Sequence, residues 1–161
     1  MIAVVRDFPP TIRPMRQADV SAVAAIENST YDFPWSAGIF RDCLLAGYTN
    51  VVLDRAGEIV GYGIMSIAAA EAHLLNICVT RELRRRGIGR NLLTYLLRRA
   101  RNCRARRMYL EVRPSNDQAM GLYSRMGFEV LGVREGYYRA HDGNEDAVVL
   151  VRHFDDGRDD S

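Results

Sequence analysis

Hydrophobic positions follow two spacings along the chain, and the changes between them mark the predicted elements. An apolar residue at every third or fourth position indicates a helix, and short apolar or alternating stretches indicate strands. We predict helices over residues 20–27, 37–46, 88–103 and 119–126. We predict strands over residues 12–15, 49–54, 59–67, 74–79, 108–112, 128–133 and 147–154. This order indicates an α/β (α+β) fold with a mostly antiparallel sheet and four helices.

Capping and turn residues support these boundaries. We expect the side chains of Asp19 and Ser36 to cap the first two helices, and residues 115–118 have capping-box spacing. Gly57 and Gly127 stand where a hairpin turn and a helix end favour positive φ. We expect residues 137–146, which are polar and aromatic, to form a long loop.

The pattern shows no internal repeat and no linker, so we expect a single domain over residues 11–154. Two consecutive prolines exclude regular structure near the start, and we expect residues 1–10 to be a flexible leader. We also expect the acidic tail, residues 155–161, to be flexible. No apolar run has the length of a membrane span or of a signal peptide.

Composition adds a few constraints. A chain of 161 residues with 48% hydrophobic and 26% charged residues fits one soluble globular domain. The net charge of +2 gives no reason to expect nucleic-acid binding. All 22 basic residues are arginine, and we interpret most of the arginines between 98 and 107 as a solvated helix face. The odd number of cysteines (Cys43, Cys78 and Cys103), all within apolar patterns, favours reduced thiols and a cytoplasmic protein.

Residues 84–90, here called the arginine–glycine turn, are the most informative stretch. They connect a predicted strand to a predicted helix, and Gly87 and Gly89 let the backbone approach a ligand closely. The free N–H groups and the dipole of the helix start favour phosphate. A tight turn with no ligand is the alternative interpretation. The turn lacks the lysine and hydroxyl of a Walker loop and the third glycine of a dinucleotide fingerprint.

Two later residues carry candidate chemistry. Glu111 lies within an apolar strand, where burial would raise its pKa toward that of a useful general base. Tyr123 lies on the buried stripe of a predicted helix, and a phenol can protonate a leaving thiolate. The alternatives are that Glu111 pairs with Arg113 or another arginine, and that Tyr123 only packs.

Other reactive residues give weaker signals. Cys78 has no evident histidine partner, so we interpret it as a packing residue rather than a nucleophile. The three histidines (His73, His141 and His153) lack metal-ligand spacing, and we expect no metal.

Several segments together resemble a known family: Asn76–Val79, Arg84–Gly89, Leu110–Arg113, Asn116 and Ala119–Phe128. With them, residues 11–154 resemble GNAT-fold N-acetyltransferases. Residues 33–36, 137–138 and 142–147 resemble the RimI type, which acetylates the N-terminal alanine of a small-subunit ribosomal protein. The resemblance implies a central mixed, mostly antiparallel sheet of about seven strands, splayed between the fourth and fifth, with about four helices.

The resemblance also implies a site for acetyl-CoA. Its pyrophosphate would lie on the backbone of the arginine–glycine turn, formed by Arg84, Arg85, Arg86, Gly87, Ile88, Gly89 and Arg90. The pantetheine arm would run along Ile77, Cys78 and Val79, where a backbone N–H would polarise the acetyl carbonyl. Asn116 would contact the cofactor arm. Glu111 would be the general base, and Tyr123 would contact the cofactor as the general acid.

The expected partner is a ribosomal protein N-terminus, contacted by Trp35, Asn76, Tyr137 and Tyr138. We expect a monomer that binds neither nucleic acid nor membrane. The alternatives are another N-terminus or a small amine as acceptor, and a non-catalytic CoA-binding module. Three positions depart from the resemblance: Arg84 stands where glutamine is also common, Cys78 where alanine is frequent and Arg139 where proline is frequent.

Overall fold

A computed structural model describes residues 9–154 of the chain. The strands are β1 (Thr11–Pro14), β2 (Thr49–Arg55), β3 (Glu58–Ala68), β4 (Glu71–Val79), β5 (Arg107–Val112), β6 (Glu129–Ala140) and β7 (Gly143–His153). The α-helices are α2 (Val20–Thr30), α3 (Ala37–Leu45), α4 (Ile88–Asn102) and α5 (Asp117–Arg125). Two short 3-10 helices, η1 (Gln17–Asp19) and η2 (Arg81–Leu83), precede α2 and follow β4. The seven predicted strands and four predicted helices are confirmed.

The seven strands form one sheet in the order β1-β2-β3-β4-β5-β7-β6. β4 and β5 pair in parallel, from Glu71 opposite Arg107 to Leu74 opposite Leu110. The pairs β1–β2, β2–β3, β5–β7 and β6–β7 are antiparallel. The predicted mixed, mostly antiparallel sheet is therefore confirmed. β4 continues to Val79 past the parallel register, and the splay of the fourth and fifth strands there stays a prediction.

The described residues divide into two compact units. The first contains residues 9–65 and 76–93, and the second contains residues 66–75 and 94–154. β3, β4 and α4 contribute residues to both. The single domain expected over residues 11–154 stays a prediction. The expected acidic tail and most of the expected leader lie outside the described residues.

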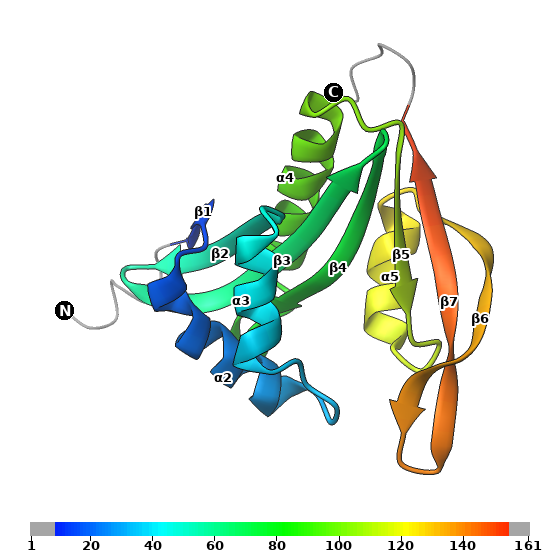
Figure 1. Ribbon diagram of the computed structural model, residues 1–161, viewed down its shortest axis with the longest axis horizontal. Coiled ribbons are helices and arrows are strands. Elements are labelled where there is room, and N and C mark those ends of the chain that lie inside the picture. The colour runs from blue at the N-terminus through cyan, green and yellow to red at the C-terminus, as the bar shows by residue number, and fades with distance from the viewer. Residues whose placement is uncertain (1–8, 155–161) are drawn as a thin grey trace. The chain divides into compact units, whose positions relative to one another are not determined.

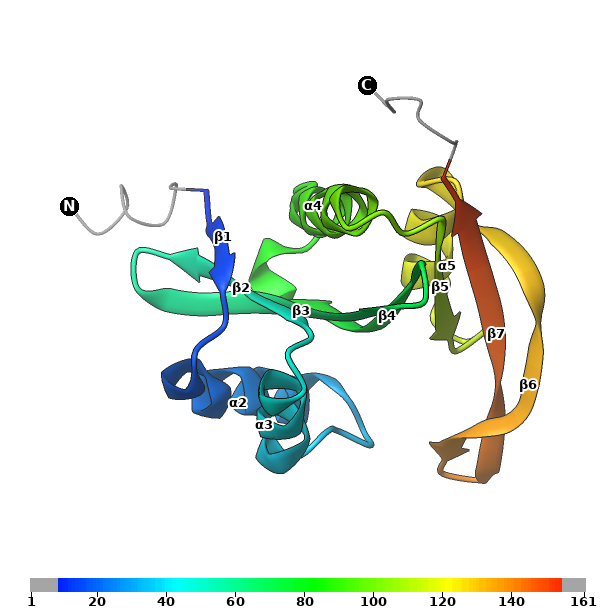
Figure 2. The same ribbon diagram turned by 45° about the horizontal axis from the view of Figure 1, so that its top comes forward.

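In the first unit, α2 and α3 lie on the same face of strands β2 and β3 (Figures 1 and 2). Their apolar sides build the core, in which Val23, Phe40 and Tyr62 are fully buried. The rings of Phe40 and Tyr62 meet edge to face, with centroids 5.5 Å apart. The apolar residues that mark the helices and those that mark the strands therefore pack together in one core, as the sequence pattern predicts.

Ser36 caps α3 as predicted, because its hydroxyl accepts a hydrogen bond from the Ile39 amide at 3.3 Å. The cap predicted at Asp19 is wrong. Asp19 stands at the N-cap position of α2 without a side-chain capping bond. Its carboxylate instead accepts hydrogen bonds from the Arg13 guanidinium and the Arg16 amide. Hydrogen bonds from a charged guanidinium to a carboxylate are stronger than a capping bond from a neutral amide, which explains this preference.

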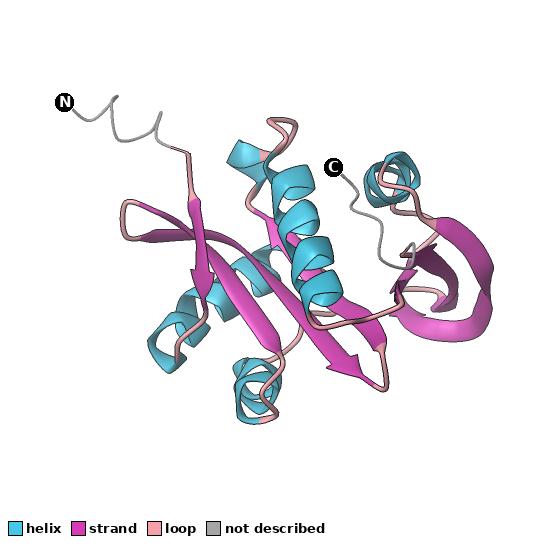
Figure 3. Cartoon of the chain, turned by 90° about the horizontal axis from the view of Figure 1, so that it is seen from above, coloured by secondary structure: helices cyan, strands magenta, loops and turns pink. Residues whose placement is uncertain are grey.

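The second unit contains α5 and the antiparallel strands β5, β7 and β6, the last two forming a long curved hairpin (Figure 3). The loop predicted over residues 137–146 is wrong, because β6 extends to Ala140 and β7 begins at Gly143. Pairing is irregular between Arg134 and Tyr138, where Gly136 has φ +58°, and then resumes. The bulge interrupts the alternation that marks a strand, while the Asp142-Gly143 pair is a hairpin signal.

The helix boundaries of this unit need one correction. The N-cap of α5 is Asn116, whose Oδ1 accepts from the Ala119 amide at 3.2 Å. The predicted capping box does not form, because Ser115 donates from its amide and hydroxyl to the Glu145 carboxylate. The positive φ predicted for Gly127 is confirmed at +89°, as is that of Gly57 in the first unit at +91°.

The cysteines also differ from expectation at one position. Cys43 and Cys78 are buried, as their apolar surroundings predict. Cys103 is exposed, because α4 ends at Asn102 and the apolar stripe ends with it. No helix within residues 9–154 is both long enough and apolar enough to span a membrane.

Candidate active site

The arginine–glycine turn leads from η2 into α4 in the first unit. Arg85 has φ +64° and Gly87 has φ +76°, so two residues of the turn adopt the left-handed conformation. α4 begins at Ile88, which places Gly89 inside its first turn. The amides of a helix's first turn have no partner within the helix and face outward at its positive end. The local backbone is compatible with a bound phosphate, and the phosphate-binding role of the turn stays a prediction.

The first side chain of the turn is hydrogen-bonded to the end of β4, and the next two side chains are exposed. Arg84 donates from Nε to the Val79 carbonyl at 3.1 Å and so ties the turn to the end of β4. Arg85 and Arg86 are exposed. A Cβ added to Gly87 would meet no atom within 4 Å, so glycine is needed there for its φ and not for space. A phosphate can therefore approach the backbone at Gly87.

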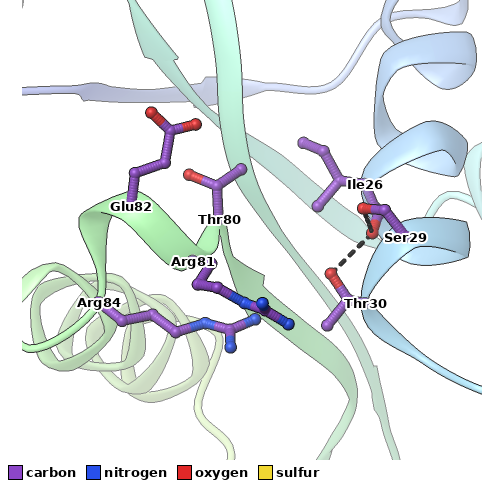
Figure 4. A pocket seen from close by; sticks show the side chains of 7 residues that line it. All are labelled: Ile26, Ser29, Thr30, Thr80, Arg81, Glu82 and Arg84. Carbon is purple, nitrogen blue, oxygen red and sulfur yellow. Dashed lines mark hydrogen bonds between the residues drawn. The ribbon is translucent and has the colours of Figure 1, made fainter.

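A cavity of about 320 Å³ lies beside the turn. In Figure 4 the Arg81 and Arg84 side chains both point toward α2, and Glu82 points away from them. The Thr80 hydroxyl is buried without a hydrogen-bond partner in the described structure. Arginines and a free hydroxyl suit an anionic, oxygen-rich ligand. The remaining lining residues are Ile26, Ser29 and Thr30 of α2, which the sequence pattern did not single out.

The end of β4 places the predicted pantetheine contacts in the same unit. Cys78 and Val79 are buried, and the Ile77 carbonyl accepts a hydrogen bond from the Tyr31 hydroxyl at 3.4 Å. Cys78 Sγ lies 3.9 Å from the Thr30 hydroxyl. It is thus close to a hydroxyl rather than to a base, which fits its interpretation as a packing residue.

A buried carboxylate organises the predicted peptide contacts of this unit. Glu27 is only 3% exposed and accepts hydrogen bonds from the Tyr62 hydroxyl at 2.7 Å, Asn76 Nδ2 at 2.8 Å and the Trp35 amide at 2.9 Å. It therefore fixes both Asn76 and the start of the segment before α3. The Trp35 ring packs on Phe40 at 5.3 Å. Sequence reasoning missed Glu27, although an acid on an apolar helix stripe is a signal that could have found it.

The predicted general base lies in the second unit. The Glu111 side chain is 8% exposed, and both of its oxygens are engaged. Oε2 lies 2.5 Å from His73 Nε2, and Oε1 accepts from Arg134 at 3.0 Å. Of the two pairings weighed for Glu111, the one with Arg113 is wrong, because Arg113 pairs with Glu145. The pairing with another arginine is confirmed.

The direction predicted for the Glu111 pKa is wrong. Burial alone raises it, but the hydrogen bonds and charges of His73 and Arg134 outweigh burial and hold the pKa below its ordinary value. His73 was missed as a partner because the sequence shows neither the β4–β5 register nor the distance between the two strands.

Tyr123 is buried on α5, as its helical spacing predicted. Its ring meets Phe128 edge to face, with centroids 5.6 Å apart. Burial, with a smaller contribution from Tyr138, raises the Tyr123 pKa above its ordinary value. The phenol therefore holds its proton at neutral pH, which a general acid requires.

The remaining predicted contacts of this unit lie on β6 and at the start of α5. Tyr137 and Tyr138 meet edge to face at 4.9 Å. The guanidinium carbon of Arg134 lies 4.3 Å from the Tyr137 ring centre, and that of Arg113 lies 4.4 Å from the Tyr138 ring centre. The Oδ1 atom of Asn116 is used in capping α5. Within residues 9–154 no three His, Cys, Asp or Glu side chains are grouped to hold a metal.

The first unit thus contains a left-handed turn at the start of α4, and the second contains a carboxylate, an imidazole and a phenol. Comparison with known proteins agrees with this chemistry. Residues 20–128 match the model of the acetyltransferase (GNAT) family. The chain is 34% identical over 141 residues to the ribosomal protein bS18-alanine N-acetyltransferase of Escherichia coli strain K12, covering 88% of this chain and 95% of that one.

A further relative and a solved structure agree. A putative bS18-alanine N-acetyltransferase of Bacillus subtilis is 34% identical, covering 86% of this chain and 92% of that one. The crystal structure of the ribosomal-protein-S18-alanine N-acetyltransferase from Escherichia coli matches with a TM-score of 0.85 and 32% identity, covering 94% and 98% of the two chains. Because residues 20–128 match the family model and relatives 34% identical are covered over nearly their full length, the chain belongs to the GNAT family of acetyltransferases.

Proposed function

We propose that the chain transfers the acetyl group of acetyl-CoA to the α-amine of the N-terminal alanine of ribosomal protein bS18. The observation that carries this proposal is the likeness to bS18-alanine N-acetyltransferases, which extends over 88% of this chain and 95% of the Escherichia coli relative. Membership of the family implies acetyl-CoA as the donor.

The roles of the site residues follow from their chemistry. The amides of residues 85–90 hold the pyrophosphate, supported by the left-handed backbone at Arg85 and Gly87. The backbone at Ile77, Cys78 and Val79 holds the pantetheine arm, and an N–H near Val79 polarises the acetyl carbonyl. Asn116 keeps its Nδ2 for the cofactor arm while Oδ1 caps α5.

The transfer is direct and needs no acyl-enzyme. A proton leaves the α-ammonium of the acceptor, and the Glu111 carboxylate serves this step as base. The free amine forms the new C–N bond at the thioester carbonyl, and the C–S bond breaks. The CoA thiolate then takes the Tyr123 proton, which burial keeps on the phenol until that step. The second proton, which the nitrogen gives up as it becomes an amide, restores the Tyr123 phenol.

Four residues are the proposed contacts of the acceptor peptide. Glu27 supports Asn76 and Trp35 in this role, because it accepts hydrogen bonds from the Asn76 side chain and from the Trp35 backbone amide. Tyr137 and Tyr138 present two rings on β6, each braced by an arginine. A monomeric state, a cytoplasmic location and the lack of nucleic-acid binding stay predictions.

A peptide panel tests the acceptor. With acetyl-CoA, we expect rapid acetylation of a peptide that copies the bS18 N-terminus starting at alanine. The same peptide with a blocked α-amine should not react, because no free amine is left at the proposed position. Mass spectrometry of the product locates the acetyl group.

Three outcomes decide between acceptors. Acetylation of lysine side chains or polyamines alone would remove the proposal. Equal rates on unrelated N-termini would keep the α-amine chemistry and remove the bS18 preference. Acetyl-CoA binding without transfer to any amine would favour a non-catalytic CoA-binding module.

A further inference from the structure

His73 is held rigidly against Glu111 within the second unit. It stands opposite Tyr109 in the parallel register of β4 and β5, and the two rings stack at 4.4 Å with an interplanar angle of 23°. This stacking fixes the plane of the imidazole. Its Nε2 then lies 2.5 Å from Glu111 Oε2. At this distance the imidazole and the carboxylate are joined by a hydrogen bond.

The hydrogen bond determines where the imidazole carries its proton. Glu111 is a carboxylate at neutral pH, since its pKa is lowered by its partners despite burial. A carboxylate only accepts hydrogen bonds, so Nε2 must donate. In the neutral ring the basic lone pair is therefore on Nδ1.

His73 is also the more accessible side chain of the two residues. Both Glu111 oxygens already accept hydrogen bonds, and that side chain is 8% exposed. The His73 side chain is 21% exposed, and within residues 9–154 its hydrogen bond is the one to Glu111. His73 therefore offers an incoming proton a lone pair that is not used in a hydrogen bond within the described residues. The Glu111 oxygens are less accessible to that proton.

The groups around the pair fit this arrangement. Arg134 of β6 donates to Glu111 and keeps it ionised, and Tyr138 of the same strand lies close enough to be influenced by the Glu111 charge. On β5 the neutral Tyr109 ring lies against the imidazole. On β7 the residue opposite Glu111 is the apolar Val149. Further along β4 and β5, Glu71 is paired with Arg107 and so is not available to His73.

We propose that the general base of the acetyl transfer is the His73–Glu111 pair, with the proton of the acceptor ammonium taken at Nδ1 of His73. This inference rests on the proposed function and refines its base. The ammonium N–H bond breaks and an Nδ1–H bond forms, directly or through one water. The imidazolium is stabilised by the Glu111 carboxylate, as in other imidazole–carboxylate pairs. After the C–N bond has formed, Nδ1 releases the proton to solvent.

Variants of His73 test the proposal with the alanine-starting peptide as acceptor. We expect His73→Ala and His73→Gln to lower kcat/KM by roughly 10²–10⁴-fold at the pH of maximal rate. Both should keep wild-type affinity for acetyl-CoA. The acidic limb of the pH profile, which reports the pair, should be lost or move to lower pH. Free imidazole should restore part of the His73→Ala activity in proportion to its unprotonated fraction.

His153→Gln is the matched control, because it removes an exposed imidazole from β7 of the same unit. It should leave rate and pH profile unchanged. If the rate of His73→Gln stays within about threefold of wild type with the same acidic limb, His73 only packs. If the limb moves to higher pH, Glu111 is the base and His73 merely lowers its pKa. Either result overturns the proposal.

Nitrogen NMR of the imidazole separates this inference from the proposed function and also covers the case of a variant that fails to fold. In the wild-type protein without substrate, we expect His73 to carry its proton on Nε2 and its titration to change in Glu111→Gln. The other tautomer, or a titration that ignores Glu111, would refute the pair. A wild-type protein inactive on every amine would refute the proposed function and leave the NMR result standing.

Discussion

A carboxylate that accepts hydrogen bonds on both oxygens is a weak base, and Glu111 is held in that state by His73 and Arg134. Such a residue contributes charge and orientation as much as basicity. Tyr123 has the complementary property, because its burial keeps the phenol protonated, as its proposed role of general acid requires. The acid–base chemistry of single residues is thus set by their neighbours.

Conservative variants test the two roles. Glu111→Gln and Tyr123→Phe should each keep acetyl-CoA binding and lower kcat by roughly 10²–10⁴-fold, the usual worth of a general acid or base. Tyr123→Phe keeps the ring contact with Phe128, so its loss is chemical rather than structural. Steady-state rates and calorimetric binding measure the two effects separately. Wild-type turnover in both variants would remove these roles.

Residue-level chemistry was only partly predictable from the sequence. Glu111 and Tyr123 could be selected because polar groups on buried positions stand out against an apolar pattern. His73 could not be selected as the partner of Glu111. The alternation of apolar and polar residues shows which face of a strand a residue lies on, but not which residue of a distant strand lies beside it. The same limit hid the bonds of Glu27 to Tyr62 and Asn76.

At the scale of elements, the arginine–glycine turn holds one strained non-glycine residue where the ligand is proposed to bind. Arg85 carries a Cβ atom and still adopts φ +64°. This conformation costs a non-glycine residue roughly 1–2 kcal/mol. Strain of this kind clusters at ligand sites, where the backbone is shaped for the ligand. The backbone of this turn, more than its arginine side chains, is therefore expected to determine binding.

Paired substitutions in the turn test this view. Gly87→Val should weaken acetyl-CoA binding by about tenfold or more, because a side chain at φ +76° forces the turn to change. Arg85→Ala should weaken binding only modestly. Arg85→Gly should bind as well as wild type, because it relieves the strain and leaves the amides in place. Isothermal calorimetry measures all three.

Gly57→Val is the control for general destabilisation. Gly57 also has positive φ and open space at its Cβ position, but it lies in the hairpin between β2 and β3. It should lower stability with little change in acetyl-CoA affinity. A larger loss of affinity in Arg85→Gly than in Gly87→Val would mean that the arginine side chain holds the phosphate.

Element boundaries were predictable where one local interaction decides them. Ser36, Gly57 and Gly127 act as the sequence suggests, because a cap or a positive φ depends on a few neighbouring atoms. The caps predicted at Asp19 and Ser115 were wrong, because other side chains bind these residues. Asp19 accepts hydrogen bonds from Arg13, six residues earlier, and Ser115 donates to Glu145, which is distant in the sequence. The β6–β7 hairpin was missed because its bulge breaks the periodicity.

At the scale of the whole molecule, the charge balance consists of carboxylates and arginines only, apart from three histidines. Hydrogen bonds from Arg13 lower the pKa of both Asp19 and Asp54. In the second unit, the hydrogen bond from Ser115 lowers the pKa of Glu145, with Arg113 contributing. Arginine does not titrate in the accessible range, so acid stability depends on these carboxyl groups.

The sign of the effect follows from linkage. A carboxyl whose folded pKa is lowered stabilises the fold above its unfolded pKa, about 4, and loses that contribution as pH falls through the folded pKa. We expect the free energy of unfolding to fall steeply below about pH 4. Arg13→Leu should lower it at neutral pH and flatten its acid dependence, because Asp19 and Asp54 lose their main partner.

Denaturant titrations at several pH values measure this dependence. Arg41→Leu is the matched control, since Arg41 is exposed on α3 and forms no ion pair within the described residues. It should leave both the neutral stability and the acid slope near wild type. Equal acid slopes in Arg13→Leu and wild type would show that the ion pairs of Arg13 do not govern acid unfolding.

The exposed Cys103 has a practical consequence for anyone who measures turnover. Dyes that follow free CoA do so by reacting with its thiol, and Cys103 offers them a thiol on the enzyme while Cys43 and Cys78 stay buried. We therefore expect one thiol per enzyme molecule to react with the dye before any turnover. The Cys103→Ser variant should remove this background signal. The same position accepts a fluorophore or spin label on the otherwise unmodified chain, one residue past the end of α4.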